Sequence, residues 1–289
     1  MISRPEAERL VERRTALRGA RDFPAADAIR ARLQAAGWDL VDTTSGSELR
    51  RVDPLPAGRR LTYLTILHGW PDDAELWLSS VTGHAPGVDF EVLLALNAPQ
   101  AALHSWARRS GEADRRVRVL VLDPPVGFGA AVNRAVEAAA GEVVVLMEPG
   151  TELEGQLAEP LLSALEEPGV GLAGAFGLRG RGTPKEFADH PGPEVDAVEG
   201  YCVAFRKRDF VAAGGFDERF RFYRIADIEF SFRMRSAGHR AVVVPGLPLR
   251  RHAHRLWEAT AEEERERLSR KNLYRFLDRW GKRSDLLLG

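Results

Sequence analysis

The sequence predicts an α/β fold in which a mostly parallel sheet is flanked by helices. Four largely apolar runs of strand length, at 61–67, 90–96, 117–123 and 142–148, alternate with stretches of helical periodicity. Strands that are apolar on both faces are typical of a parallel sheet covered by helices on both sides. Ligands bind to such sheets at the carboxyl ends of the strands, so we expect the functional residues directly after these runs.

A small unit is expected ahead of this sheet, in residues 1–52. Apolar residues at helical spacing predict a helical hairpin, whose second helix begins at Pro24. The residues that follow predict a β-hairpin that turns at Ser45-Gly46. Pro and Gly in 53–58 mark a linker, after which residues 60–289 form the main domain.

The other elements of the main domain follow from the same rules. The Gly- and Pro-rich stretch 177–200 is expected to be a mobile loop, and VVVPG at 242–246 a short strand. Helices are expected where apolar residues recur every three or four positions, at 72–83, 98–110, 128–140, 226–237 and 257–280.

The composition is that of an ordinary globular protein of 289 residues, with 44% apolar and 29% charged residues. Its 41 basic and 42 acidic residues nearly cancel, so the net charge gives no reason to expect nucleic acid or an anionic membrane as a partner. No apolar stretch of about 18 residues predicts a membrane span, and the charged N-terminus differs from a signal peptide, so we expect a cytoplasmic protein. Cys202 is the only cysteine, which excludes a disulfide framework within the chain.

Two motifs of the main domain are similar to those of a known family. Gly214-Gly215-Phe216-Asp217-Glu218 precedes an acidic pair in Ala226-Asp227-Ile228-Glu229, which opens an Arg-rich stretch ending in Ala237-Gly238. Gly127 to Asn133 also fits a Gly-x-x-x-x-x-Asn segment. On these motifs, residues 60–255 resemble the family 2 glycosyltransferases. The resemblance implies the GT-A fold of the nucleotide-diphospho-sugar transferases.

The resemblance also implies a reaction, the inverting transfer of a sugar from a nucleotide-sugar donor to the hydroxyl of an unknown acceptor. Asp227 stands where the family has the base that takes the acceptor proton. Family members hold Mn or Mg with an Asp-x-Asp motif, but this chain has Glu148-Pro149-Gly150, so one of the two carboxylates is absent. The candidate metal ligands are therefore Glu148 and His252, which together with His254 follows the last strand, where some family members have a metal-binding histidine.

The donor is expected to bind where the strands end. Asn97 stands where the family has a nucleotide-binding Asp, which is a second departure from the pattern. Trp70 could stack on a nucleotide base or simply pack in the core. Asn133 could contact the nucleotide or form a structural hydrogen bond. Asp217 could stabilise a turn or contribute to the donor site. The donor-binding candidates are His68, Trp70, Asn97, Asn133, Glu148, Asp217 and Glu229.

A second resemblance lies in the small N-terminal unit. Residues 11–51 resemble the C-terminal helical tail of bacterial cysteinyl-tRNA synthetases, through segments such as Ala20-Arg21-Asp22-Phe23 and Asp42 to Gly46. None of the synthetase's catalytic motifs is present. Residues 1–60 hold 12 Arg against nine Asp and Glu, a surplus of three that is weak for RNA binding. A protein partner or self-association through residues 1–52 is therefore preferred to RNA.

Three functions stay open from the sequence. The first is an active sugar transferase. The second is a catalytically degenerate GT-A scaffold that binds a partner, because two of the family's expected site positions are altered. The third is an RNA-associated protein that acts through the N-terminal unit. Turnover of a nucleotide sugar distinguishes the first from the second, and salt-dependent tRNA binding tests the third.

Overall fold

The chain is described here from a computed structural model. Its residues fall into two units, Met1–Ala57 and Gly58–Gly289, and each is described by itself. The structure describes residues 4–20, 22, 25, 26, 28, 29, 32, 33, 38–43, 46–51 and 60–288.

The N-terminal unit contains helix α1 (Arg4–Gly19) and a β-hairpin. Strands β1 (Trp38–Thr43) and β2 (Gly46–Arg51) pair antiparallel, with Thr43 opposite Gly46, as the sequence predicts. The described residues between 25 and 33 are helical, whereas Pro24, Ser45 and the expected linker 53–58 lie outside the described residues. The described residues of this unit include a small buried apolar cluster that consists of Ala7, Ile29, Leu33 and Trp38.

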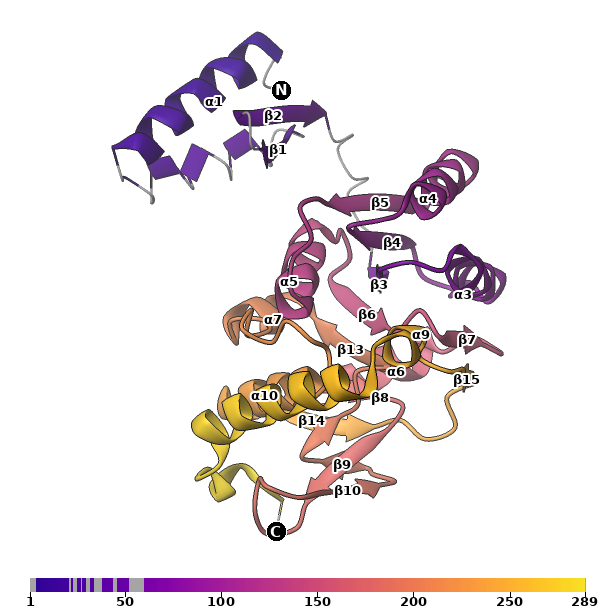
Figure 1. The fold of residues 1–289 in the computed structure, drawn as a ribbon. Helices are drawn as coiled ribbons and strands as arrows, with labels where there is room; N and C mark the ends of the chain where they lie inside the picture. Colours follow the sequence, from indigo (N-terminus) through magenta and orange to yellow (C-terminus); the bar gives the residue numbers. More distant parts are fainter. Residues whose placement is uncertain are drawn as a thin grey trace. The chain divides into compact units, whose positions relative to one another are not determined.

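The four predicted strands form the parallel half of an eight-stranded sheet in the main unit (Figure 1). They are β3 (Leu61–Leu67), β4 (Phe90–Asn97), β5 (Val117–Leu122) and β6 (Val143–Met147). Their order in the sheet is β6-β3-β4-β5, and every pair among these neighbours is parallel. All residues of β3, β4 and β6 are buried, which confirms the prediction from their apolar runs.

The other half of the sheet is mixed. Strand β13 (Cys202–Arg206) lies antiparallel between β6 and β8 (Val170–Gly174). Strand β14 (Arg240–Val243) continues parallel to β8, and the two-residue β11 (Glu194–Val195) ends the sheet antiparallel to β14. The sequence predicts β14 but not β8.

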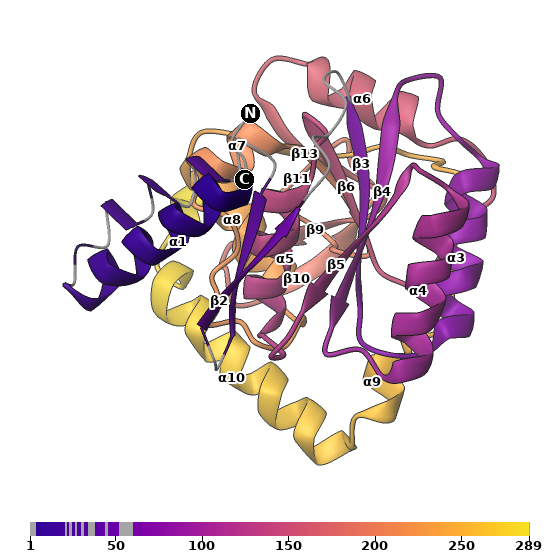
Figure 2. The same cartoon turned by 90° about the horizontal axis from the view of Figure 1, so that it is seen from above.

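Helices cover both faces of this sheet (Figures 1 and 2). Buried residues of α3 (Pro71–Gly83), α4 (Ala101–Ala113) and α6 (Ala158–Glu166) belong to one apolar cluster. Those of α5 (Phe128–Ala138), α7 (Lys207–Ala212), α8 (Ala226–Ser236) and α10 (Glu262–Trp280) belong to a second cluster on the opposite face. The sheet is thus the middle layer of three.

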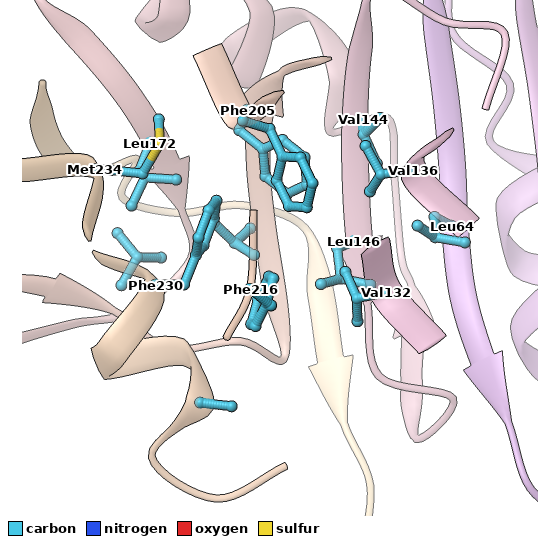
Figure 3. Close-up of a cluster of buried hydrophobic side chains, with 14 of the residues drawn as sticks. Leu64, Val132, Val136, Val144, Leu146, Leu172, Phe205, Phe216, Phe230 and Met234 are labelled. Atoms are coloured by element: carbon cyan, nitrogen blue, oxygen red, sulfur yellow. The ribbon is translucent and has the colours of Figure 1, made fainter. Parts of the chain in front are cut away.

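The second cluster joins both halves of the sheet to the helices that carry the family-like motifs (Figure 3). Phe216 stacks on Phe230 at 4.5 Å between ring centroids, and Phe205 stacks on Phe210 at 5.0 Å. Stacked and edge-on aromatic pairs of this kind add to the stability gained from area burial. The turn at Phe216 and the start of α8 are therefore fixed to the core.

Two expectations about the second half are wrong. Residues 177–200 are not a loop, because β9 (Gly177–Gly180), β10 (Phe187–His190) and β12 (Ala197–Val198) form a three-stranded antiparallel sheet. Fully buried Asp196 accepts hydrogen bonds from the backbone of Gly180 and Leu288, which satisfies this otherwise costly carboxylate.

The second wrong expectation is a single last helix. The chain forms a short helix, α9 (Arg255–Ala259), and after a break begins α10 at Glu262. Just before α9, β15 (Leu249–Arg251) pairs antiparallel with β7 (Thr151–Leu153), and a 3-10 turn at Ser284–Leu286 follows α10. No helix among the described residues is long and apolar enough to cross a bilayer.

Candidate active site

A cleft of about 800 Å³, open to solvent, lies at the carboxyl ends of β3 and β6. This is the edge of the sheet that the sequence predicts for the site. His68 and Trp70 line the cleft from the residues after β3, Glu148 from the end of β6, and Asp227 from the first turn of α8. The other lining residues are Ile66, Gly69, Asp73, Phe128, Leu146, Met147, Pro149, Gly150, Gly200, Phe216, Tyr223, His254, Arg255 and Leu256.

Asp227 is held by backbone hydrogen bonds on both carboxylate oxygens. Gly200 N–H donates to Oδ2 and Ile228 N–H to Oδ1, each at 2.9 Å. Burial raises the pKa of this carboxyl, and the two backbone donors partly oppose the increase. Each oxygen keeps a further lone pair, so the side chain can accept a proton from a hydroxyl placed in the cleft.

Ile225, just before α8, helps to set this position. It has a φ of 70°, in the left-handed region that a β-branched residue rarely adopts. Trp70, which precedes α3 on the other side of the cleft, also has a positive φ of 55°. Such strained residues occur most often at functional sites.

Glu148 is the second carboxylate in the cleft. Its Oε2 lies 3.4 Å from a guanidinium nitrogen of Arg251, and its Oε1 lies 3.8 Å from Nε2 of His254. Burial raises the pKa of Glu148 to about 7; the Arg251 cation opposes this effect, while the charges of Asp227 and Glu199 add to it. The protonation state of Glu148 therefore changes near neutral pH.

Both histidines that line the cleft favour the neutral form. Burial lowers the pKa of His68, and it lowers the pKa of His254 to about 4. The His254 ring stacks on Tyr223 at 4.2 Å, and its Nδ1 accepts the backbone N–H of Trp257 at 3.2 Å. In the neutral ring the proton then lies on Nε2, which is the atom that faces Glu148.

A smaller cavity of about 250 Å³ adjoins the cleft and shares Glu148, Gly200, Tyr223 and Asp227 with it. Arg251 forms part of its wall, where its guanidinium lies over the Tyr201 ring and pairs with Glu199 at 3.1 Å. The other wall residues are Glu199, Tyr201, Arg224 and Ile225.

Two asparagines predicted for donor binding do not line the cleft. Asn97 is buried and exchanges two hydrogen bonds with the backbone of Val126, at 2.9 and 3.0 Å. Asn133 does the same with Phe216, at 3.0 and 2.9 Å, and so ties α5 to the Gly-Gly-Phe-Asp-Glu turn. Both side chains thus hold the loops that border the site.

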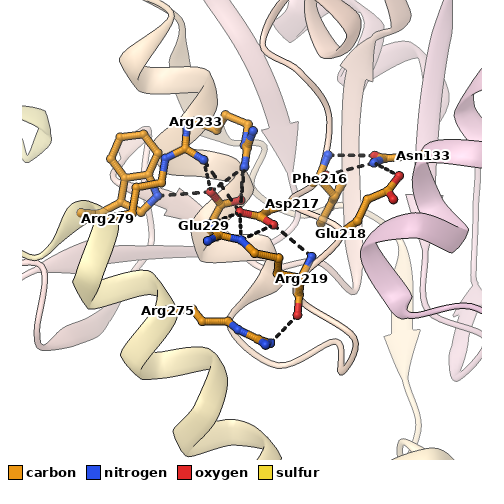
Figure 4. A network of polar contacts seen from close by, with 10 residues as sticks. Asn133, Phe216, Asp217, Glu218, Arg219, Glu229, Arg233, Arg275 and Arg279 are labelled. Atoms are coloured by element: carbon orange, nitrogen blue, oxygen red, sulfur yellow. Dashed lines mark hydrogen bonds and ion pairs between the residues drawn. The ribbon is translucent and has the colours of Figure 1, made fainter. Parts of the chain in front are cut away.

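Asp217 and Glu229 belong to a network of ion pairs away from the lining residues (Figure 4). Arg233 contacts both carboxylates, at 3.5 Å from Asp217 and 3.0 Å from Glu229. Glu229 is almost fully buried and also pairs with Arg279 of α10 at 3.4 Å. Hydrogen bonds from Arg219 lower the pKa of Asp217. The network joins α8 and the turn before it to α10.

The comparisons with known proteins agree with this architecture. The sequence profile of Glycosyl transferase family 2 matches residues 77–229, which is more than half of the chain. The chain belongs to glycosyl transferase family 2.

Two relatives match this family 2 chain over about two thirds of its length. An uncharacterized protein, y4gI, of Sinorhizobium fredii is 27% identical over 216 residues, or 64% of this chain. The O-antigen biosynthesis protein RfbC of Myxococcus xanthus is 28% identical over 205 residues, or 60% of this chain. The chain spans 24% of the first relative and 16% of the second.

Solved structures of glycosyltransferases share the fold, which establishes it as GT-A. GalNAc-T7 with UDP, GalNAc and Mn²⁺ matches 80% of this chain and 50% of its own, with a TM-score of 0.63 at 13% identity. The mannosyltransferase PcManGT of Pyrobaculum calidifontis with GDP-Man and Mn²⁺ matches 86% and 71%, with a TM-score of 0.53 at 19% identity. S. aureus TarS matches 77% and 44%, with a TM-score of 0.52 at 15% identity. None of these matches supports the resemblance of residues 11–51 to a tRNA synthetase.

The side chains around Glu148 in this family 2 chain provide a poor set of ligands for a metal ion. Among the residues that the structure describes, no group of three or more His, Cys, Asp or Glu could hold a metal ion. Glu148 is the only carboxylate of the Glu148-Pro149-Gly150 segment, and His254 presents an N–H rather than a lone pair toward it. His252, the histidine chosen from the sequence, instead lies 2.8 Å from Glu152 and does not line the cleft.

Sequence reasoning missed several groups at the site. Asp73, Glu199, Tyr223, Arg251 and Arg255 line the two cavities but were not among the predicted site residues, and His254 was considered only beside His252 as a metal ligand. Arg251 ends β15 and Arg255 lies four residues after it, and this position at the end of a strand was the available signal. Nothing local marks Glu199, because its partner Arg251 is distant in sequence.

Proposed function

We propose that the chain is an inverting glycosyltransferase that uses a nucleoside-diphosphate sugar and an acceptor hydroxyl, with Asp227 as the base. One observation carries this proposal. The Asp227 side chain, whose two oxygens each accept one backbone N–H, lines a cleft at the carboxyl edge of a GT-A sheet together with Glu148 at the end of β6. Membership of glycosyl transferase family 2 supports the reaction class.

The groups on the chain suit the proton transfer. As the acceptor oxygen bonds to the anomeric carbon and the bond to the diphosphate breaks, the acceptor proton passes to Asp227. A carboxyl whose pKa is raised by burial is a stronger base than an exposed aspartate, which favours this transfer near neutral pH. The backbone N–H groups of Gly200 and Ile228 keep the carboxylate fixed, so little reorganisation is needed.

The other lining residues of the cleft suit a nucleotide-sugar donor, which has an apolar base and polar phosphate and sugar groups. Trp70, Phe128, Phe216 and Leu256 provide apolar walls, which exclude water from the reacting centre. We propose that Trp70 and His68 contact the nucleoside. Asn97, Asn133, Asp217 and Glu229 then act as positioning residues, because their side chains bind the protein's own backbone or arginines.

A degenerate scaffold is the second candidate, and a specific observation favours it. The Asn97 side chain is buried against Val126 and does not line the cleft, and Gly150 has no side chain, so two of the family's ligand positions present no side-chain ligand to a donor in the cleft. This candidate predicts no turnover even if a nucleotide binds.

Calorimetric titration with UDP, GDP and dTDP, each with Mn²⁺ or with EDTA, tests both candidates. Mn²⁺ is included because two of the structural neighbours contain it together with a nucleotide or nucleotide sugar. Micromolar binding, followed by turnover of the matching sugar donor that Asp227→Asn abolishes, supports the transferase. Binding without turnover of any donor supports the scaffold. Absence of binding under all conditions contradicts the transferase and favours a scaffold that binds a partner rather than a nucleotide.

We propose that the N-terminal unit mediates docking or self-association rather than RNA binding. Its small buried cluster and nearly balanced charge support this assignment. Sedimentation of the full chain beside a chain that begins at Gly58 tests it, since only the full chain should self-associate or retain a protein partner. Retention of tRNA by the full chain alone, with a steep salt dependence, would favour RNA instead.

A further inference from the structure

The residues that line the cleft carry an excess of negative charge. Asp73, Glu148 and Asp227 are acidic, whereas Arg255 is the one Lys or Arg among the described residues that line the cleft. His68 and His254 are kept neutral by burial and add no positive charge. A diphosphate that enters this cleft therefore meets few cations on the protein.

Arg255 lies at the start of α9 and pairs with Asp73 of α3. A guanidinium nitrogen lies 3.0 Å from Oδ1 of Asp73, and both side chains belong to the cleft wall. The Arg255 side chain is 45% exposed, so it can turn toward a ligand without unpacking the core. Asp73 is more enclosed, at 21% exposure, and burial raises its pKa although Arg255 lies beside it.

Arg251, a cation in the wall of the adjoining smaller cavity, is less available. It is shared between Glu148 and Glu199, at 3.4 and 3.1 Å, and covers the Tyr201 ring. Withdrawing it would leave two half-buried carboxylates without their cation, which is costly. Withdrawing Arg255 would leave a single carboxylate, Asp73, whose side chain is 21% exposed.

We infer that Arg255 is the diphosphate-binding cation of this site and that Asp73 holds it in place until the nucleotide displaces Asp73. A planar guanidinium suits bidentate contact with phosphate oxygens. The inference rests on the proposed function, because it names the group that receives the donor's diphosphate. An arginine in this role would also explain how the site can bind a diphosphate although it has fewer carboxylates than a metal requires.

The inference predicts that substitutions of Asp73 and of Arg255 change nucleotide affinity in opposite directions. Calorimetry on the full chain with UDP and GDP in EDTA is the test. Arg255→Gln should weaken binding at least tenfold, while Asp73→Asn should strengthen it about threefold or more, because the competing anion is gone. In the double variant the gain from Asp73→Asn should vanish. UMP and GMP, which lack the second phosphate, should lose less than UDP and GDP on Arg255→Gln.

Arg250 and Glu154 provide a matched control pair. They form an exposed ion pair between β15 and the residue directly after β7, and neither lines the cleft. Arg250→Gln and Glu154→Gln should leave UDP and GDP affinity unchanged, and thermal unfolding should show all variants folded. Unaltered affinity in Arg255→Gln, or weaker binding in Asp73→Asn, overturns the inference while the proposed function stands. Binding by the wild type only with Mn²⁺ also overturns it. Absence of binding by the wild type in every condition overturns the proposed function as well.

Discussion

Asp227 lies close enough to Glu148 for its negative charge to raise the pKa of the Glu148 carboxyl. The two residues come from different elements, the start of α8 and the end of β6, and both line the larger cleft and the smaller cavity beside it. Their environments differ. Asp227 accepts two backbone N–H groups, whereas Glu148 depends on Arg251. Because of this difference, we expect substitutions of Asp227 and of Glu148 to have different effects.

Asp227→Asn should reduce turnover of the nucleotide sugar by about 100- to 10,000-fold, the range expected for the loss of a general base. The amide keeps the size of the side chain, so affinity for the nucleoside diphosphate should change less than threefold. Single-turnover assays beside calorimetry separate the two effects. Asp278→Asn, on the exposed face of α10, is the control. Unchanged turnover in Asp227→Asn would remove Asp227 from the mechanism.

Glu148→Gln should stabilise the folded chain in a pH-dependent way. The pKa of the folded state lies near 7 and the ordinary value is 4.5, so the folded carboxyl binds its proton more tightly than the unfolded one. Wild-type stability is therefore lost as pH rises from 4.5 to 7, by an upper limit of about 3 kcal/mol. The variant lacks this loss. Its melting temperature should exceed that of the wild type at pH 8, and the difference should shrink toward pH 4.5. A constant difference across this range would contradict the assignment.

Glu229→Gln should destabilise the chain by about 1.5–3 kcal/mol, because Arg233 and Arg279 lose a charged acceptor in a buried site. Urea unfolding measures this change. Glu263→Gln, on the exposed first turn of α10, should stay within about 0.5 kcal/mol of the wild type. If Glu229→Gln instead keeps its stability and loses UDP affinity, the residue binds the donor.

Asn133→Ala should cost about 1–3 kcal/mol, because both the N–H and the C=O of Phe216 lose their side-chain partner. Arg134→Ala, the exposed neighbour on α5, should cost less than about 0.5 kcal/mol. Denaturant unfolding of the two variants gives the comparison. Equal stability of both would show that the hydrogen bonds of Asn133 contribute little to folding.

The sequence by itself determined the four parallel strands and the edge at which the cleft lies. These follow from apolar runs and from the rule that ligands bind at the carboxyl ends of parallel strands, both of which are local patterns. It also predicted that His68, Trp70, Glu148 and Asp227 belong to the site, because each lies just after a strand or in the first turn of a helix, and all four line the cleft.

Only the tertiary structure decided the remaining parts of the site. The Asp73–Arg255 pair and the Glu199–Arg251 pair join residues that are distant in the chain, so no local spacing marks them. The sheet in 177–200 was missed for a similar reason, since the buried Asp196 that supports it binds the backbone of Leu288 at the other end of the domain. Burial then fixes the charge states, because the pKa values of Glu148 and His254 depend on what covers them rather than on their neighbours in sequence.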